Sequence, residues 1–102
     1  MHYQLVIQFA VDADDEERLA RLIEIEGRMD RAADAETVEV DGFDFGAGEM
    51  NIFAYTGDPK AALEALRTHI PPDESWRAAY RGVDDEDYIV LFPPGLDAFE
   101  VA

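Results

Sequence analysis

Residues 41–59, which read DGFDFGAGEMNIFAYTGDP, constrain the fold of this chain more than any other segment. The runs 37–45 and 49–56 are both rich in residue types that favour β-strands. A Gly-Ala-Gly sequence lies between them, and glycine supplies the positive φ angles that a tight hairpin loop requires. We therefore predict a β-hairpin whose loop is centred on Ala47.

This loop fixes a register that sorts the side chains of the hairpin onto two faces. One face mixes aromatic rings with carboxylates and an amide, whereas the other is smaller and mostly aliphatic and includes Met50 and Ile52. We expect helices to cover the aliphatic face and to leave the aromatic face open, so truncation of Phe53 or Tyr55 should cost little stability. The residues predicted on the aromatic face are Glu39, Asp41, Phe43, Phe45, Glu49, Asn51, Phe53 and Tyr55.

The remaining patterns predict two helices and three further strands. Bulky apolar residues recur at every second position over 3–11, as in a β-strand. Asp14 with Glu17 favours one helix start, and Asp58 followed by Pro59 favours another. The elements expected in chain order are a strand at 3–11, a helix at 14–33, strands at 37–45 and 49–56, a helix at 58–70, strands at 76–81 and 88–92, and a tail at 96–102.

This order predicts an α+β fold, a ferredoxin-like βαββαβ sandwich with one extra strand near the C-terminus. In that fold two helices cover one face of an antiparallel sheet, and the first and third strands lie side by side at its centre. We expect residues 1–102 to form a single domain. The other sheet face should be open, unless a slip in register or the tail, with Leu96, Phe99 and Val101, covers it.

Charge is the strongest global feature of the sequence, with 24 acidic and 8 basic residues and a formal net charge of −16. This balance argues against nucleic acid as a partner, because phosphates are bound by clustered lysine and arginine. Acidic membrane surfaces are disfavoured for the same reason. The acidity is typical either of a surface that binds a basic protein or of a protein adapted to solubility or to a salty cytoplasm.

The sequence predicts no catalytic group, metal site or cofactor. It contains no cysteine and a single serine, Ser75, so neither thiol chemistry nor a serine triad is expected. The acidic turns do not have the spacing of an EF-hand loop. No apolar run reaches the roughly 20 residues that span a membrane, and no basic segment precedes the first apolar run. We therefore expect a cytoplasmic protein that is not an enzyme.

Two segments, DGFDFGAGEMNIFAYTGDP at 41–59 and AAYRGVDDEDYIVLFP at 78–93, carry a resemblance. The chain is similar there to a group of small, acidic, uncharacterised bacterial proteins with DG-x-D-x-G-x-GEMNIF and AYR-x-V-D-x-EDY segments. The resemblance implies a bacterial cytoplasmic origin and carries over no catalytic role. The matching positions include Glu49, Asn51, Tyr80, Arg81, Asp87 and Tyr88.

These observations favour a binding role. The leading hypothesis is a non-enzymatic acidic protein-binding module, such as a bacterial immunity protein or inhibitor that blocks a basic toxin or nuclease. The alternative is a homodimeric ferredoxin-like module that holds a small ligand between two open sheet faces. Arg81 and Asp87 are also predicted to pair across the last hairpin. The residues expected to contact a partner are Asp41, Phe43, Glu49, Asn51, Phe53, Tyr55, Arg81 and Asp87.

Overall fold

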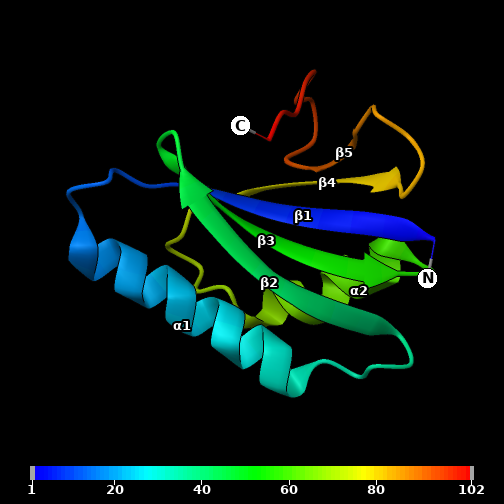
Figure 1. Cartoon of the computed structure of the whole chain (residues 1–102), viewed down its shortest axis with the longest axis horizontal. Coiled ribbons are helices and arrows are strands. Elements are labelled where there is room, and N and C mark those ends of the chain that lie inside the picture. The colour runs from blue at the N-terminus through cyan, green and yellow to red at the C-terminus, as the bar shows by residue number, and fades with distance from the viewer. Residues whose placement is uncertain (1, 102) are drawn as a thin grey trace.

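The computed structural model describes residues 2–101, which form a five-stranded antiparallel sheet and two α-helices (Figure 1). The elements are β1 (Tyr3–Ala10), α1 (Glu16–Ala32), β2 (Val38–Gly46), β3 (Glu49–Thr56), α2 (Pro59–Leu66), a 3-10 turn at Arg67–His69, β4 (Arg77–Gly82) and β5 (Ile89–Phe92). The strand order is β2-β3-β1-β4-β5, which makes β1 and β3 neighbours inside the sheet. The predicted α+β class and antiparallel sheet are confirmed.

Side-chain caps determine where both helices begin. The Asp58 carboxylate accepts a hydrogen bond from the backbone N–H of Ala61 at 3.2 Å, so α2 starts as predicted. Asp15 caps α1 by accepting from the backbone N–H of Arg18 at 3.0 Å, which moves the cap one residue beyond the predicted Asp14. Neither helix in the described range is long and apolar enough to cross a membrane.

The main core lies between one face of the sheet and both helices, which lie on the same side of it (Figure 1). Its buried members include Leu5, Ile7 and Phe9 from β1, Leu22, Ile25 and Met29 from α1, Met50, Ile52 and Ala54 from β3, and Ala62, Leu63 and Leu66 from α2. The strand residues recur at every second position because successive side chains of a strand point to opposite faces. The predicted burial of Met50 and Ile52 is therefore confirmed.

The β2–β3 hairpin turns over two residues rather than the predicted three. Ala47 and Gly48 have positive φ angles of 53° and 80°, and Gly46 pairs with Glu49 across the strands. Positive φ at both central positions is the geometry of the two-residue turns that match the twist of paired strands. The loop is thus one residue shorter than the loop predicted from the sequence.

Near the turn, the shorter loop shifts the pairing of β2 with β3 by one residue from the predicted register. A β-bulge farther along β2 restores the predicted register. The pairs near the turn are Phe45 with Met50, Asp44 with Asn51 and Phe43 with Ile52. A one-residue slip moves side chains to the other face. Phe43 and Phe45 therefore lie on the helix side, and their predicted placement with Phe53 is wrong. The bulge between Val40 and Phe43 contains Gly42 at a φ of 99°, and beyond it Glu39 faces Tyr55 as predicted.

Residues 96–101 lie over part of the sheet face that carries no helix, which corrects the expectation of an open face (Figure 1). Phe99 is only 8% exposed and packs against Val6 and Ala79. Its ring centroid lies 5.3 Å from that of Tyr88. Ala102, which ends the predicted tail, lies outside the described residues. The tail thus forms a second, smaller core with this face.

Phe99→Ala is expected to lower the free energy of unfolding by about 2 to 4 kcal/mol, because it removes the ring that fills this second core. Urea unfolding of the variant checks the value. Leu96→Ala is the matched control, since Leu96 lies in the same segment but outside the second core, and it should cost less than about 1 kcal/mol. Equal small losses in the two variants would contradict the packing of the tail.

Glu26 on α1 lies where its ionised form is disfavoured. Burial, and after it the negative charge of Asp30, raise the pKa of the Glu26 carboxyl above its usual range. A raised carboxyl pKa means that the folded state binds the proton more tightly than the unfolded state. The ionised Glu26 carboxylate therefore lowers the free energy of unfolding fully at pH values above its raised pKa. This destabilisation is relieved as the pH falls through that pKa.

Glu26→Gln is accordingly expected to raise the free energy of unfolding at pH 7, by about 0.2 to 0.5 kcal/mol for relief of an i, i+4 pair of like charges. The gain should shrink as the pH falls, which urea unfolding over a neutral to acidic series measures. Glu24→Gln should show no gain, because Glu24 pairs with Arg28 at 3.6 Å. A loss of stability in Glu26→Gln at pH 7 would refute this explanation.

Candidate functional site

The half of β2 nearest the turn presents two exposed aromatic rings beside carboxylates. Phe43 is 40% exposed and Phe45 is 37% exposed, although both lie on the helix side of the sheet. Asp41 lies in the bulge, and Asp44 points to the opposite side of the sheet. Since β2 is an edge strand of the sheet, its outer edge has no strand neighbour within residues 2–101. We call Asp41, Phe43, Asp44 and Phe45 the hairpin edge.

The hairpin edge lies in a long stretch of sequence without positive charge. Residues 32–59 contain no lysine, arginine or histidine. Arg18, Arg28 and Arg67 form ion pairs with Glu74, Glu24 and Glu64, which lie outside this stretch. Its acidic residues are Asp34, Glu36, Glu39, Asp41, Asp44, Glu49 and Asp58. The hairpin therefore offers exposed aromatic area in a stretch of sequence whose charged residues are all acidic.

A chain of side-chain hydrogen bonds behind the hairpin edge holds Asp44 in place. The Asn51 Nδ2 donates to Asp44 Oδ1 at 3.0 Å and to Glu49 Oε1 at 3.3 Å. The Gln8 Nε2 donates to Asn51 Oδ1 at 3.0 Å and to the Glu100 carbonyl at 2.8 Å. Asn51 is 1% exposed, so it cannot contact a partner directly, contrary to the sequence prediction. Its role is to position two carboxylates.

Arg81 belongs to a second polar cluster, on the face without helices. Its Nε donates to Gln4 Oε1 at 2.9 Å, and its Nη1 donates to the Asp85 carbonyl at 2.6 Å. The Tyr88 hydroxyl donates to the same Gln4 oxygen at 3.3 Å. Asp87 is exposed and forms no ion pair with Arg81, so the predicted cross-strand pair is wrong. Arg81 in β4 instead connects β1 with the β4–β5 loop through these hydrogen bonds.

Phe53 and Tyr55 lie on the face without helices, as predicted, but neither is fully exposed. Phe53 packs against the second core around Phe99, and Tyr55 lies opposite Gln4 in β1. The eight residues predicted to bind a partner are therefore not one surface. Asp41 and Phe43 belong to the hairpin edge, Glu49 and Asn51 to the hydrogen-bonded network behind it, Phe53, Tyr55 and Arg81 to the face without helices, and Asp87 to the β4–β5 loop.

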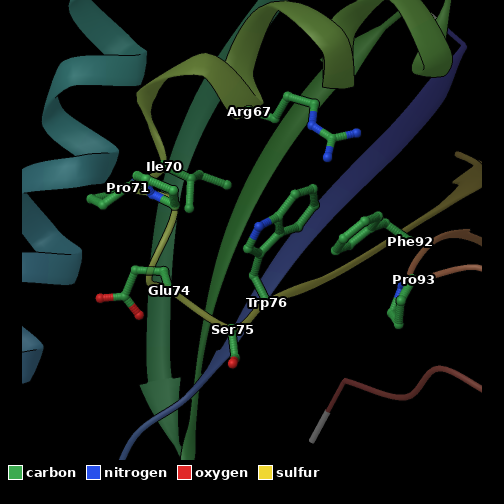
Figure 2. Close-up of a pocket in the computed structure, with 9 residues that line it drawn as sticks. Arg67, Ile70, Pro71, Glu74, Ser75, Trp76, Phe92 and Pro93 are labelled. Atoms are coloured by element: carbon green, nitrogen blue, oxygen red, sulfur yellow. The ribbon is translucent and has the colours of Figure 1, made fainter.

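A separate groove of about 500 Å³ lies between the end of α2 and strand β5, and Figure 2 shows the residues that line it. Trp76 and Phe92 stack in it, with ring centroids 4.1 Å apart and an interplanar angle of 19°. The guanidinium carbon of Arg67 lies 5.1 Å from the Trp76 ring centroid and 5.0 Å from that of Phe92. This site was not predicted from the sequence, where the single tryptophan was the only available signal.

Metal binding is not supported within residues 2–101, where no three histidine or acidic side chains are grouped to hold an ion. The hairpin edge and the groove beside Trp76 both offer contact to another molecule. Comparison of the chain with protein-family models, with curated proteins and with solved structures finds no match.

Proposed function

We propose that this chain is a non-enzymatic acidic protein-binding module whose hairpin edge binds a basic protein. The observation that carries the proposal is the pair of exposed rings, Phe43 and Phe45, on an edge strand within a stretch of sequence that has no cation. A bacterial immunity protein or inhibitor that acts in the cytoplasm on a basic toxin or nuclease is the form of this function that the resemblance and the charge favour.

Charge and aromatic area contribute to binding in different ways. Opposite charges accelerate encounter and suppress wrong partners, whereas a few buried aromatic anchors supply most of the affinity. Carboxylates on an edge strand also deter pairing with another copy, because two acidic strands repel each other. Asp41 and Asp44 therefore favour a basic partner over a second copy at this edge.

Affinity capture with matched baits tests the proposal. The baits are the wild-type chain, Phe43→Ser/Phe45→Ser, and Val83→Ser/Ile89→Ser, which alters two exposed apolar residues elsewhere. We expect the wild type and the control to retain a protein with an isoelectric point above about 9, and the hairpin variant to lose it. Its retention should also fall between low and moderate salt. Capture of no basic protein, or equal capture by all three baits, would overturn the proposal.

The alternative of a homodimer joined through the face without helices is favoured by the half-buried rings of Phe53 and Tyr55 on that face. Residues 96–101 already cover part of the face, which reduces the apolar area left for a second copy. Sedimentation at several salt concentrations distinguishes the two functions. A chain that stays monomeric when salt screens its charge contradicts the homodimer.

We also infer that the fold is ferredoxin-like, with β5 added at one edge. The inference is supported by the neighbour order β2-β3-β1-β4 and by the alternation of helices and strands along the chain. An experimentally determined structure in which β1 and β3 are not neighbours would contradict it.

A further inference from the structure

We infer that the groove beside Trp76 is a binding site for a small aromatic monocarboxylate, independent of the hairpin edge. The groove has the volume of a small-molecule site, about 500 Å³, and its lining presents polar and apolar surface in nearly equal parts, as a ligand with a ring and a charged group requires. Ile70, Pro71, Pro72, Trp76, Phe92 and Pro93 form the apolar part, and Arg67, Glu74 and Ser75 form the polar part.

The stacked rings of Trp76 and Phe92 define the shape of the ligand. Figure 2 shows the two rings next to each other below Arg67, with Trp76 coming from the residue before β4 and Phe92 from the end of β5. The two rings stack on each other at 19°, so a further flat ring would contact the ring edges and outer faces that this stack leaves. The proline rings beside them, Pro71 and Pro93, are rigid and change shape little when a ligand binds.

The charge of the groove selects an anion. Glu74 is neutralised by Arg18, whose Nη1 lies 2.7 Å from Glu74 Oε1, and this pair is largely shielded from solvent. Besides the Trp76 and Phe92 rings, Arg67 contacts the exposed Glu64 at 3.4 Å, which is a weak surface ion pair. The Nε and Nη2 of Arg67 donate no hydrogen bond to the described residues. A guanidinium with unused donors beside two rings suits a carboxylate.

The overall charge of the chain limits the ligand to a single negative charge. The formal net charge of −16 repels anions, and among residues 2–101 Arg67 is the only cation that lines the groove. A phosphate monoester carries up to two negative charges and is usually held by several donors or cations. A monocarboxylate needs one guanidinium, which can bind it through two parallel hydrogen bonds. The flat ring then stacks beside Trp76.

Fluorescence titration tests the site, because Trp76 is the only tryptophan in the chain and reports on the groove directly. The probes are phenylacetate and its neutral analogue phenylacetamide. We expect a saturable change in Trp76 emission, with phenylacetate bound about 10-fold to 100-fold more tightly, as a charge-assisted hydrogen bond implies. Equal affinity for acid and amide, or no saturable change with the acid, would overturn the inference.

Two arginine variants make the test specific. Arg67→Gln should remove the preference for the acid, whereas Arg77→Gln should keep it. Arg77 is the residue after Trp76, but it pairs with Gln8 in β1 and lies outside the groove. If Arg77→Gln loses the preference as fully as Arg67→Gln, the preference comes from general charge and the site is refuted. The acid-to-amide ratio of the wild type decides the matter even if Arg67→Gln proves unstable.

Discussion

Met50→Ala and Ile52→Ala are each expected to lower the free energy of unfolding by about 2 to 5 kcal/mol, which is a large part of the stability of a small domain. Both side chains are fully buried between β3 and the helices. Truncation therefore loses transfer free energy and leaves a cavity that rigid neighbours fill only in part. Urea unfolding monitored by circular dichroism measures both variants.

Tyr55→Ala is the control for this prediction, since Tyr55 lies on the same strand but faces the other side of the sheet and is half-buried. Its truncation should cost on the order of 1 kcal/mol. A loss as large as that of Met50→Ala would show that Tyr55 is also a core residue, and its half-buried position on the face without helices would then be wrong.

Phe45→Ala is expected to weaken binding of the basic partner by about 30-fold or more, which corresponds to the roughly 2 kcal/mol typical of an aromatic hot spot. The folding stability should change by less than about 1 kcal/mol, because the ring is already 37% exposed in the free chain. Calorimetric titration with the captured partner gives the first value, and urea unfolding gives the second.

Charge reversal at the same edge separates electrostatic steering from packing. Asp41→Lys should lower the association rate at low salt, and the difference from wild type should shrink as salt is added. Asp84→Lys makes the same change of charge in the β4–β5 loop and should have a smaller effect. Equal losses of rate in both variants would mean that the partner senses only the net charge of the chain.

The sequence was sufficient to place the helices and strands, and it failed on the register of one half of the hairpin. Glycines flank Ala47, so the positive φ angles were assigned to them and a three-residue loop was assumed. Ala47 itself adopts a φ of 53°, although a residue with a Cβ does so at a cost of about 1 kcal/mol. The resulting two-residue turn places Phe43 and Phe45 on the helix side of the sheet, whereas a three-residue loop would have placed them on the other face.

Contacts between distant segments could not be predicted from local patterns. The Gln8 side chain binds the Glu100 carbonyl across 92 positions of sequence, and Phe99 fills the face that local alternation marked as open. The groove likewise requires the end of α2, the start of β4 and the end of β5 to meet. Periodicity reports which side of an element is apolar and not which segment covers it.

Site-specific photocrosslinking in the cells of origin tests the central claim most directly. A benzoylphenylalanine placed at position 45 probes the hairpin edge, and the same group at position 89 probes Ile89, an exposed apolar residue on β5 at the opposite edge of the sheet. We predict an adduct at position 45, absent at position 89, with one protein whose isoelectric point is above about 9. No adduct at position 45, or the same set of adducts at both positions, would contradict the claim that the hairpin edge binds a basic partner.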